Sequence, residues 1–214
     1  MAGLLRKDWY YLRAYGWPYL PLLALLSLSP GVMGPAYAMT LALTLPRMII
    51  SNDALRWDRY AVMTPLRAEQ IVAEKYLVQL ACIALAAVCM ALSFPVQNWV
   101  IRLAGRAEAA WSLGWRDILV YVLIQTWTAV IVAALALPLL YRLGTWRGQI
   151  LTNILVILLL TLTGTVILNR LYVLPGPTMA AAAAVMAVPA ALALALSYRL
   201  SVRLCWARLR GRWA

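Results

Sequence analysis

The sequence predicts an all-α membrane protein with six transmembrane helices, cytoplasmic N- and C-termini and an amphipathic interfacial helix at the N-terminus. Two observations support this fold class directly. Of the 214 residues, 65% are hydrophobic and only 12% are charged, whereas soluble domains are about 45–50% apolar and about 25% charged. The mean hydropathy is +0.82. A soluble chain of this length cannot hide so much apolar surface from water, so we expect the bilayer to be its solvent.

The predicted spans follow one another through short loops and form a single transmembrane domain over residues 1–214. The apolar segments lie near residues 17–33, 35–50, 70–95, 117–141, 150–169 and 179–204. Each of the last four reaches the roughly 20 residues that a transmembrane helix needs. Residues 17–50 would be about 51 Å long as one helix, longer than the ~30 Å hydrocarbon core. A turn rich in Pro and Gly at residues 30–35 divides them into two short helices, with a re-entrant hairpin as the alternative.

The distribution of basic residues predicts which side of the membrane each end occupies. The chain has 19 basic and 7 acidic residues, no histidine and a formal net charge of +12. With the N-terminus inside, 15 of the basic residues fall on the cytoplasmic side, and the others, Arg102, Arg106, Arg116 and Arg170, fall outside. Cytoplasmic loops of membrane proteins carry such an excess of Lys and Arg. The basic total therefore indicates orientation and not nucleic-acid binding, which needs a soluble basic face.

The residue types that are missing exclude most enzyme chemistry. Without histidine the chain builds no His metal ligand, no His general base and no Ser-His-Asp triad. The three cysteines, Cys82, Cys89 and Cys205, form no CxxC pair, so neither a zinc site nor a redox site is predicted. No Gly-x4-Gly-Lys motif occurs and neither lysine follows a glycine, so the chain has no P-loop for ATP. We expect no enzyme activity, metal or cofactor on this chain.

Residues 1–15 have the pattern of an amphipathic helix that lies in the membrane interface. Trp9 shares one arc of the helix with three leucines, and Lys7 lies on the opposite arc with two arginines. Asp8 falls on the apolar arc, where a helix that only touches lipid would not place a carboxylate. The segment is therefore predicted to be either a membrane-surface anchor or a docking element for a cytoplasmic partner.

The longest predicted cytoplasmic connection, residues 51–69, has a helical pattern of its own. Trp57 and Tyr60 begin an i, i+3, i+4, i+7 series that ends at Thr64, which predicts a short helix with one aromatic face. Thr64 and Pro65 then have the types preferred at the N-cap and the first position of the next helix. The segment is either a solvated loop helix or a knob that inserts aromatic anchors into a groove of another protein.

Two parts of this sequence resemble a known family. They are the opening Leu4-Leu5-Arg6-Lys7-Asp8 and the later series Asn52-Asp53…Trp57-Asp58-Arg59-Tyr60…Pro65-x-Arg67…Ile71-Val72…Lys75-Tyr76. Together they resemble small permeases of the ABC-2 type, in the branch that includes the membrane subunit of the phenol-soluble-modulin exporter. The motifs cover residues 4–76, and the length and six-span layout are similar over the whole chain.

The resemblance implies a transporter assembled from separate subunits. Two copies of the permease would form a homodimer and pair with two copies of an ABC ATPase, and that partner would hold ATP and Mg²⁺. Residues 51–69 would be the coupling segment, residues 1–15 an interfacial connecting helix, and the loop 143–149 a second ATPase contact. The coupling residues implied in this way are Asp53, Arg56, Trp57, Asp58, Arg59, Tyr60, Met63, Pro65 and Arg67, with Lys7, Asp8 and Trp9 on the interfacial helix.

Polar residues on the fifth predicted helix form a second candidate site. Several of them are separated by multiples of four residues and so lie on one slowly turning stripe: Asn153, Thr161, Thr165 and Asn169. Such a stripe either packs against a neighbouring helix, with its hydroxyls bonded to their own backbone, or faces a central conduit or dimer seam. The resemblance favours the first and fifth helices at that seam. The predicted substrate path consists of Trp17, Tyr19, Tyr37, Asn153, Thr161 and Thr165.

The remaining polar and aromatic features are predicted to be structural. Residues 96–116 carry three tryptophans and are expected to form an interfacial helix or cap on the outer side, with a gate over the exit as the alternative. Gln125, Thr126 and Thr128 are expected to hold helices together. The basic C-terminal residues 203–212 are expected to bind anionic head groups.

Together with the resemblance, these features predict a multi-pass protein of the bacterial cytoplasmic membrane. We expect the permease subunit of an ATP-driven ABC exporter that moves amphipathic peptides or similar hydrophobic compounds out of the cell. Its partners would be the ABC ATPase, a second permease copy and membrane lipid, and no nucleic acid. No ionisable side chain is predicted near the middle of the bilayer, which argues against an ion-coupled carrier. Exporters of drugs, lipids or bacteriocins, and a membrane anchor without transport activity, are the alternatives.

Overall fold

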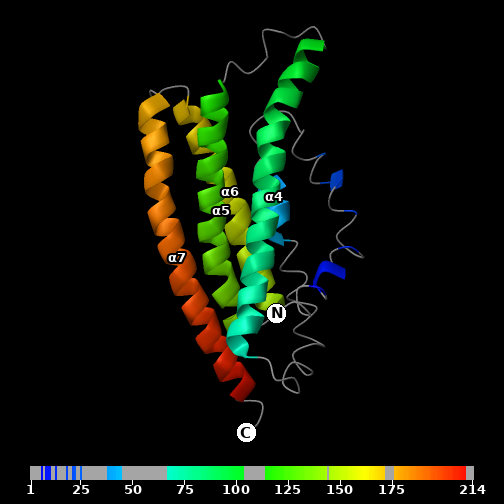
Figure 1. The fold of residues 1–214 in the computed structure, drawn as a ribbon, viewed down its shortest axis with the longest axis vertical. Helices are drawn as coiled ribbons and strands as arrows, with labels where there is room; N and C mark the ends of the chain where they lie inside the picture. The colour runs from blue at the N-terminus through cyan, green and yellow to red at the C-terminus, as the bar shows by residue number, and fades with distance from the viewer. Residues whose placement is uncertain are drawn as a thin grey trace.

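A computed structural model gives the chain as a bundle of long helices (Figure 1). The structure describes residues 6, 8–10, 13, 18, 21–22, 25, 38–44, 67–103, 114–143, 145–171 and 176–210. Within them lie the helices α4 (Ala68–Leu103), α5 (Trp115–Leu143), α6 (Thr145–Leu171) and α7 (Gly176–Arg210). Residues 38–44 are also helical, and no strand occurs among the described residues. The described part of the chain is all-α, as predicted.

The helix α5 lies at the centre of the bundle. It packs against α4, α6 and α7, and α4 also contacts α7. Because neighbours surround α5, its side chains form much of the core, including Tyr121, Ala133 and Leu137. Residues 38–44 add Met39 and Leu43 to the same core. The α5 sequence is accordingly apolar on all sides, as expected of an enclosed helix.

Three of the described helices are long and apolar enough to cross a membrane. They are α4, α5 and the Ala180–Ala207 part of α7, and α6 contains a shorter apolar stretch, Ile150–Thr163. At 1.5 Å per residue α4 is about 54 Å long, well beyond the roughly 30 Å hydrocarbon core. Figure 1 shows the last turns of α4 passing the start of α5, and the last turns of α7 passing the start of α4.

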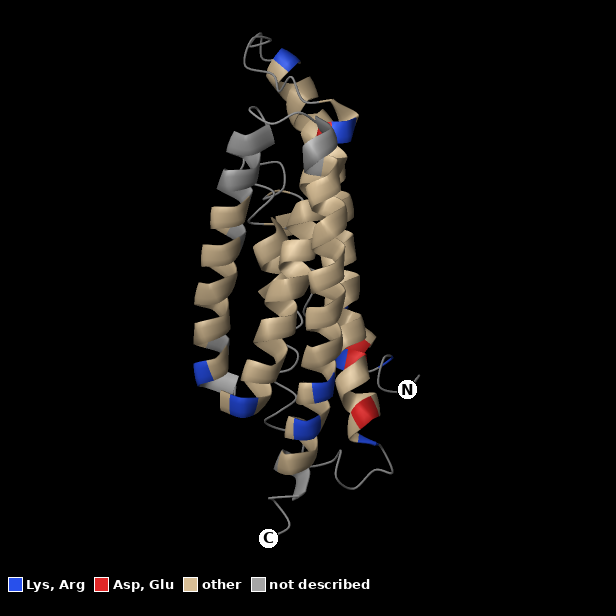
Figure 2. Ribbon diagram, turned by 90° about the vertical axis from the view of Figure 1, so that its left-hand side faces the viewer, with Lys and Arg blue, Asp and Glu red and all other residues tan. Residues whose placement is uncertain are grey.

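Charged side chains gather at the two ends of the bundle and leave a long uncharged middle (Figure 2). In α5 no charged residue occurs between Asp117 and Arg142, a stretch of about 36 Å that covers the hydrocarbon core. The outward faces along this middle are apolar and exposed, with Leu77, Leu85, Val88, Leu92 and Val96 on α4 and Val185, Val188, Leu192, Leu196 and Leu200 on α7. Such faces suit lipid and would be a liability in water.

We name the two ends of the bundle by the predicted orientation. The end where α4 begins and where α5 and α7 finish is the one predicted to face the cytoplasm, and we call it the inner end. The opposite end, where α4 finishes and α5 begins, is the outer end. The predicted spans 17–33 and 35–50 lie largely outside the described residues. The total of six spans and the orientation of the chain in the membrane therefore stay predictions.

The helix that contains the predicted third span, residues 70–95, is longer than that span. The helix α4 continues through Pro95 to Leu103, so residues 96–103 are its last turns and not the start of a separate outer segment. A proline normally weakens a helix because it lacks an N–H. In a bilayer, leaving the helix would expose more unsatisfied backbone groups than one proline does, so the helix continues.

The start of α4 also differs from the prediction. The helix begins at Ala68, so Arg67 is its N-cap, whereas Thr64 and Pro65 were the expected cap and first residue. Gln70 at the third position accepts a hydrogen bond from the backbone N–H of Arg67 at 3.3 Å. This is the reciprocal half of a capping box, and it satisfies a donor that the helix leaves open.

The predicted loop 143–149 is mostly helical. The helix α5 ends at Leu143 and α6 begins at Thr145, so the two are joined by a very short connection. Gly148 makes this possible because a Cβ at that position would lie 3.1 Å from the Leu140 Cα. Only a residue without a side chain lets α6 approach the α5 backbone so closely.

Four threonines of α5 and α6 satisfy their hydroxyls on their own helices. Thr126, Thr128 and Thr152 each donate a hydrogen bond to the carbonyl four residues earlier, at 2.7, 2.9 and 2.7 Å. Thr163 makes the same bond to Leu159. A hydroxyl bonded to its own helix needs no other partner, so these bonds do not join α5 to a neighbour, and the predicted role of Thr126 and Thr128 in holding helices together stays a prediction.

Substitution of Gly148 by valine tests the contact between α5 and α6. We expect Gly148→Val to lower the free energy of unfolding by about 1–3 kcal/mol, because the added atoms meet backbone that cannot rotate away. Thermal unfolding in detergent, followed by tryptophan fluorescence, measures the effect. Ala184→Val adds atoms on an exposed face of α7 and serves as the control. Equal unfolding midpoints for the two variants would contradict the close approach of α6 to the α5 backbone.

Candidate functional site

Three ionisable side chains are buried together at the inner end of α4. The Lys75 Nζ lies 2.8 Å from Asp8 Oδ2 and 3.8 Å from Glu74 Oε2. Lys75 is 5% exposed, Glu74 1% and Asp8 0%. Asp8 and Lys75 are 67 positions apart in the sequence, so their ion pair fastens the N-terminal segment to α4. Removing one partner of a buried ion pair leaves the other charge uncompensated, which is strongly destabilising.

The burial of Asp8 explains its place on the apolar arc of the N-terminal helix. Its carboxylate faces α4, whereas Trp9 is 64% exposed and Arg6 and Arg13 are also exposed. The side of the segment that carries Asp8 therefore packs on the chain itself. Lys7, the third residue predicted for the interfacial helix, lies outside the described residues.

A chain of hydroxyl groups connects α4 to α7 and α5 at the same end. The Tyr76 hydroxyl lies 2.5 Å from Ser197 Oγ and 2.9 Å from Ser201 Oγ. The Ser197 hydroxyl donates to the carbonyl of Ala134 on α5. Each hydroxyl has one proton, so Tyr76 must donate to Ser197 and Ser201 must donate to Tyr76. Every proton in this chain is used, and the chain joins three helices.

The first turn of α4 has a further contact with α7. The Tyr198 hydroxyl donates a hydrogen bond to the Glu69 carbonyl at 3.2 Å. The Tyr198 ring also packs edge-on against Tyr76, with ring centroids 5.6 Å apart and an interplanar angle of 85°, an arrangement that aromatic pairs prefer. The inner end of α4 is therefore held by the N-terminal segment through Asp8 and by α7 through two tyrosines.

Gln79 lies one helical turn after Lys75 and is 1% exposed. Both polar atoms of its amide are buried, and neither has a hydrogen-bond partner in the part of the chain that the structure describes. An unsatisfied buried amide costs about 1–3 kcal/mol, so such groups are rare in folded proteins. An amide both donates and accepts, and this position can take a water or a polar group of another molecule.

The structure describes few of the residues predicted to contact the ATPase or the substrate. Arg67 is exposed and caps α4, but the other predicted coupling residues lie outside the described residues, as do Trp17, Tyr19 and Tyr37. Asn153 and Thr161 lie half-buried on α6, and the side chain of Thr165 is not described. The roles of all these residues stay predictions.

Sequence reasoning missed most of the contacts at the inner end. The sequence pattern singled out Asp8. Its partner Lys75 lies on α4, and no pattern within one helix indicates that the two side chains meet. Ser197 and Ser201 are the clearest missed signal, because they are four residues apart and so share one face of a helix that is rich in Ala and Leu. Gln79 was detectable as a lone amide within an apolar run.

Comparison with known proteins identifies the class of the chain. Residues 3–205 match the family described as ABC-2 family transporter protein, and the chain belongs to this family. No curated protein and no solved structure matches the sequence. The family and the apolar helices together identify a multi-pass membrane protein that is the permease subunit of an ABC transporter. This confirms the ABC-2 type that residues 4–76 resemble and extends it across α4 to α7.

Substitution of Lys75 tests the buried ion pair. We expect Lys75→Met to lower the free energy of unfolding by about 3–5 kcal/mol, because Asp8 loses its counter-charge while still buried. The double variant Asp8→Leu/Lys75→Met removes both charges and should recover much of this loss. Thermal unfolding of the unsubstituted chain, the single variants Asp8→Leu and Lys75→Met and the double variant gives the coupling energy, and losses that simply add would show that the two side chains act independently.

Substitution of Gln79 tests whether its amide lacks a hydrogen-bond partner. We expect Gln79→Leu to leave the unfolding midpoint unchanged or to raise it, because no hydrogen bond is lost and an unsatisfied amide is removed. Gln125→Leu is the matched control, since Gln125 is equally buried on α5 and does have an interaction partner, although its Oε1 accepts no hydrogen bond within the described residues. The control should lower the midpoint. A similar decrease in both variants would contradict the assignment of Gln79 as unpartnered.

Proposed function

We propose that this chain is the membrane subunit of an ATP-driven exporter that moves amphipathic peptides or similar hydrophobic compounds outward. Membership of the ABC-2 transporter family supports a permease that works with an ABC ATPase in general. The sequence has no P-loop of its own. The energy for transport must then enter through a contact with the ATPase.

The observation that carries the proposal is the anchoring of α4 directly after the predicted coupling segment. This segment covers residues 51–69, and its last two residues form the start of α4, which begins at Ala68. Within its first three turns α4 is bound to the N-terminal segment through Lys75 and to α7 through Tyr76. A displacement of the coupling segment would therefore move α4, and α7 with it.

The subunits then have distinct tasks. The ATPase holds ATP and Mg²⁺, and its two copies close on nucleotide binding. Two copies of the permease, forming a homodimer, would receive this movement through residues 51–69 and switch between inward-open and outward-open states. The hydroxyl chain keeps α4 and α7 together during the switch, and the buried ion pair keeps the N-terminal segment on α4. The movement of the coupling segment would therefore be transmitted to the spans.

The character of the spans supports an amphipathic or hydrophobic substrate. Between their charged ends the described helices carry no Asp, Glu, Lys or Arg. A path through such helices offers apolar contacts and a few neutral polar groups, among them the amide of Gln79. A compound that needs a charged partner near the middle of the bilayer would find none on these helices.

Substitution of Trp57 tests the coupling. In proteoliposomes with the co-purified ATPase, we expect Trp57→Ala to reduce ATP-driven export of a fluorescent amphipathic helical peptide by at least about tenfold, as loss of a central aromatic anchor typically costs 2 kcal/mol or more. Arg59→Ala should act in the same direction. ATP hydrolysis should persist but no longer rise when peptide is added.

Trp99→Ala is the matched control for this experiment. Trp99 is an exposed tryptophan near the outer end of α4, far from the predicted coupling segment, and its loss should leave export unchanged. Normal export by Trp57→Ala would contradict the coupling role. If peptide does not stimulate hydrolysis even with the unsubstituted chain, the peptide assignment fails, and a chain without any effect on hydrolysis would be a membrane anchor.

A further inference from the structure

One exposed face of α7 changes from apolar to basic toward the inner end of the bundle. Exposed residues of this helix follow one another at alternating steps of four and three positions: Leu192, Leu196, Arg199, Arg203 and Trp206. At 3.6 residues per turn these positions fall within an arc of about 80°. They form one continuous surface, which we call the α7 strip, with two leucines, then two arginines and then a tryptophan of the kind found at membrane interfaces.

The arginines of the α7 strip lie where the hydrocarbon core ends. The helices α5 and α7 run in the same direction, and the bond from the Ser197 hydroxyl to the Ala134 carbonyl fixes their relative heights. At 1.5 Å per residue, Arg203 lies within about 3 Å of the height of Arg142, where the uncharged stretch of α5 ends. Arg199 lies about one turn deeper, and its long side chain can extend to the lipid head groups.

No carboxylate of the described residues offsets the positive charge of the α7 strip. No Asp or Glu follows Asp117 in the sequence, and Figure 2 shows basic but no acidic turns on α7 near the C-terminus. Glu69 of α4 lies beside α7, where its carbonyl accepts the hydrogen bond from Tyr198. Within the described ranges, neither Arg199 nor Arg203 forms an ion pair with it or with another acid.

The excess of positive charge does not depend on the undescribed segments. On the side predicted to be cytoplasmic, 15 basic residues stand against five acidic ones. Even complete pairing of these acids would leave most of the arginines without a counter-charge. An anionic ligand is therefore attracted to this end of the bundle.

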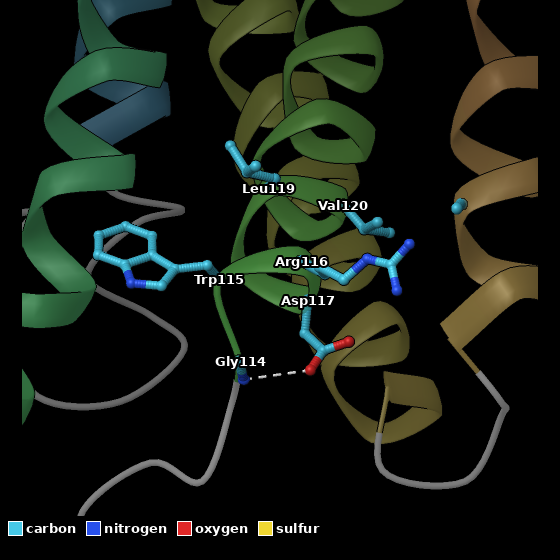
Figure 3. Close-up of a pocket in the computed structure, with 7 residues that line it drawn as sticks. Gly114, Trp115, Arg116, Asp117, Leu119 and Val120 are labelled. Carbon is cyan, nitrogen blue, oxygen red and sulfur yellow. Dashed lines mark hydrogen bonds between the residues drawn. The ribbon is translucent and has the colours of Figure 1, made fainter.

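The outer end of the bundle has no such imbalance. The hollow in Figure 3 is lined by Arg116 and also by Asp117, whose Oδ2 accepts a hydrogen bond from the Gly114 N–H at 3.2 Å. One basic and one acidic residue leave this lining without net charge. A phosphate bound there would not distinguish an anionic lipid from a net-neutral one, so the outer end supplies the control for the α7 strip.

We propose that the α7 strip binds an anionic phospholipid at the inner end of the bundle. The guanidinium groups of Arg199 and Arg203, one helical turn apart, bind the phosphate oxygens. The acyl chain lies along Leu192 and Leu196. A net-neutral phospholipid with the same phosphate also carries an ammonium group, which would meet two cations and no carboxylate of the described residues.

The position of the leucines favours a lipid over an acidic protein as the ligand. An acidic protein surface would use the two arginines but leave the apolar half of the strip unused, whereas a lipid uses both. Head-group binding was predicted for residues 203–212 in general. The α7 strip adds Arg199 and a place for the acyl chain, and it is independent of the proposed coupling.

Lipid binding to the purified full-length chain tests the proposal. Native mass spectrometry in a neutral detergent gives the dissociation constants of phosphatidylglycerol and of phosphatidylcholine with equal chain length. We expect Arg199→Gln/Arg203→Gln to bind phosphatidylglycerol at least about tenfold more weakly, because each basic residue near anionic head groups contributes a factor of about five. Phosphatidylcholine should lose less affinity, so the preference of the unsubstituted chain for phosphatidylglycerol disappears.

Arg102→Gln/Arg116→Gln is the charge-matched control. Both arginines are exposed at the outer end, and their loss should leave the preference for phosphatidylglycerol unchanged. Leu196→Asn should weaken both lipids by a similar factor, because it alters only the surface for the acyl chain. All these side chains are exposed, so the unfolding midpoints in detergent without lipid should equal that of the unsubstituted chain.

Three results would overturn the proposal. The first is an equal loss of preference in the two double arginine variants, and the second is displacement of bound phosphatidylglycerol by inorganic phosphate at equal concentration. The third is unchanged lipid binding by Arg199→Gln/Arg203→Gln together with loss of the ATPase from the purified complex, since the strip would then bind an acidic protein. The unsubstituted chain gives a test without variants: its preference for phosphatidylglycerol should decrease as salt is added, and a preference independent of salt would contradict the role of charge.

Discussion

Lys75 carries its charge where almost no solvent reaches it, and Asp8 is the residue that makes this position stable. An isolated ammonium group in a low-dielectric surrounding costs several kcal/mol. The Asp8 carboxylate at 2.8 Å offsets that cost, but only if the N-terminal segment stays against α4. The ion pair thus holds the N-terminal segment against the inner end of α4. The other contacts at the inner end depend on this position.

The same end of the bundle joins three helices through neutral groups. The hydroxyl chain from Ser201 through Tyr76 and Ser197 to the Ala134 carbonyl has no unused proton, so it is directional and complete. An ion pair tolerates some sliding of its partners, whereas such a chain requires one alignment of the helices. The two arrangements together give α4 a fixed inner end, while its outer half has an exposed apolar face and contacts lipid.

Apolar runs in the sequence predicted the helices over residues 68–210 better than the contacts between them. The bounds of α5 differ from the prediction by two residues at each end, because a long apolar run has few alternatives in a bilayer. The helix α4 extends eight residues past the predicted span, through Pro95 to Leu103, because a helix that ended within the bilayer would leave backbone groups unsatisfied. The contact between Asp8 and Lys75 joins residues 67 positions apart, and no periodicity within one helix reveals such a pairing.

The central claim is that α4 and α7 move as one unit when the coupling segment is displaced. Spin labels on Glu69 of α4 and Arg199 of α7, both exposed, test this most directly in the complex with its ATPase, after replacement of the three native cysteines. The account predicts that the distance between the labels is the same without nucleotide and with ATP, while the distance between Glu69 labels in the two permease copies changes. A Glu69–Arg199 distance that shifts with ATP would contradict it.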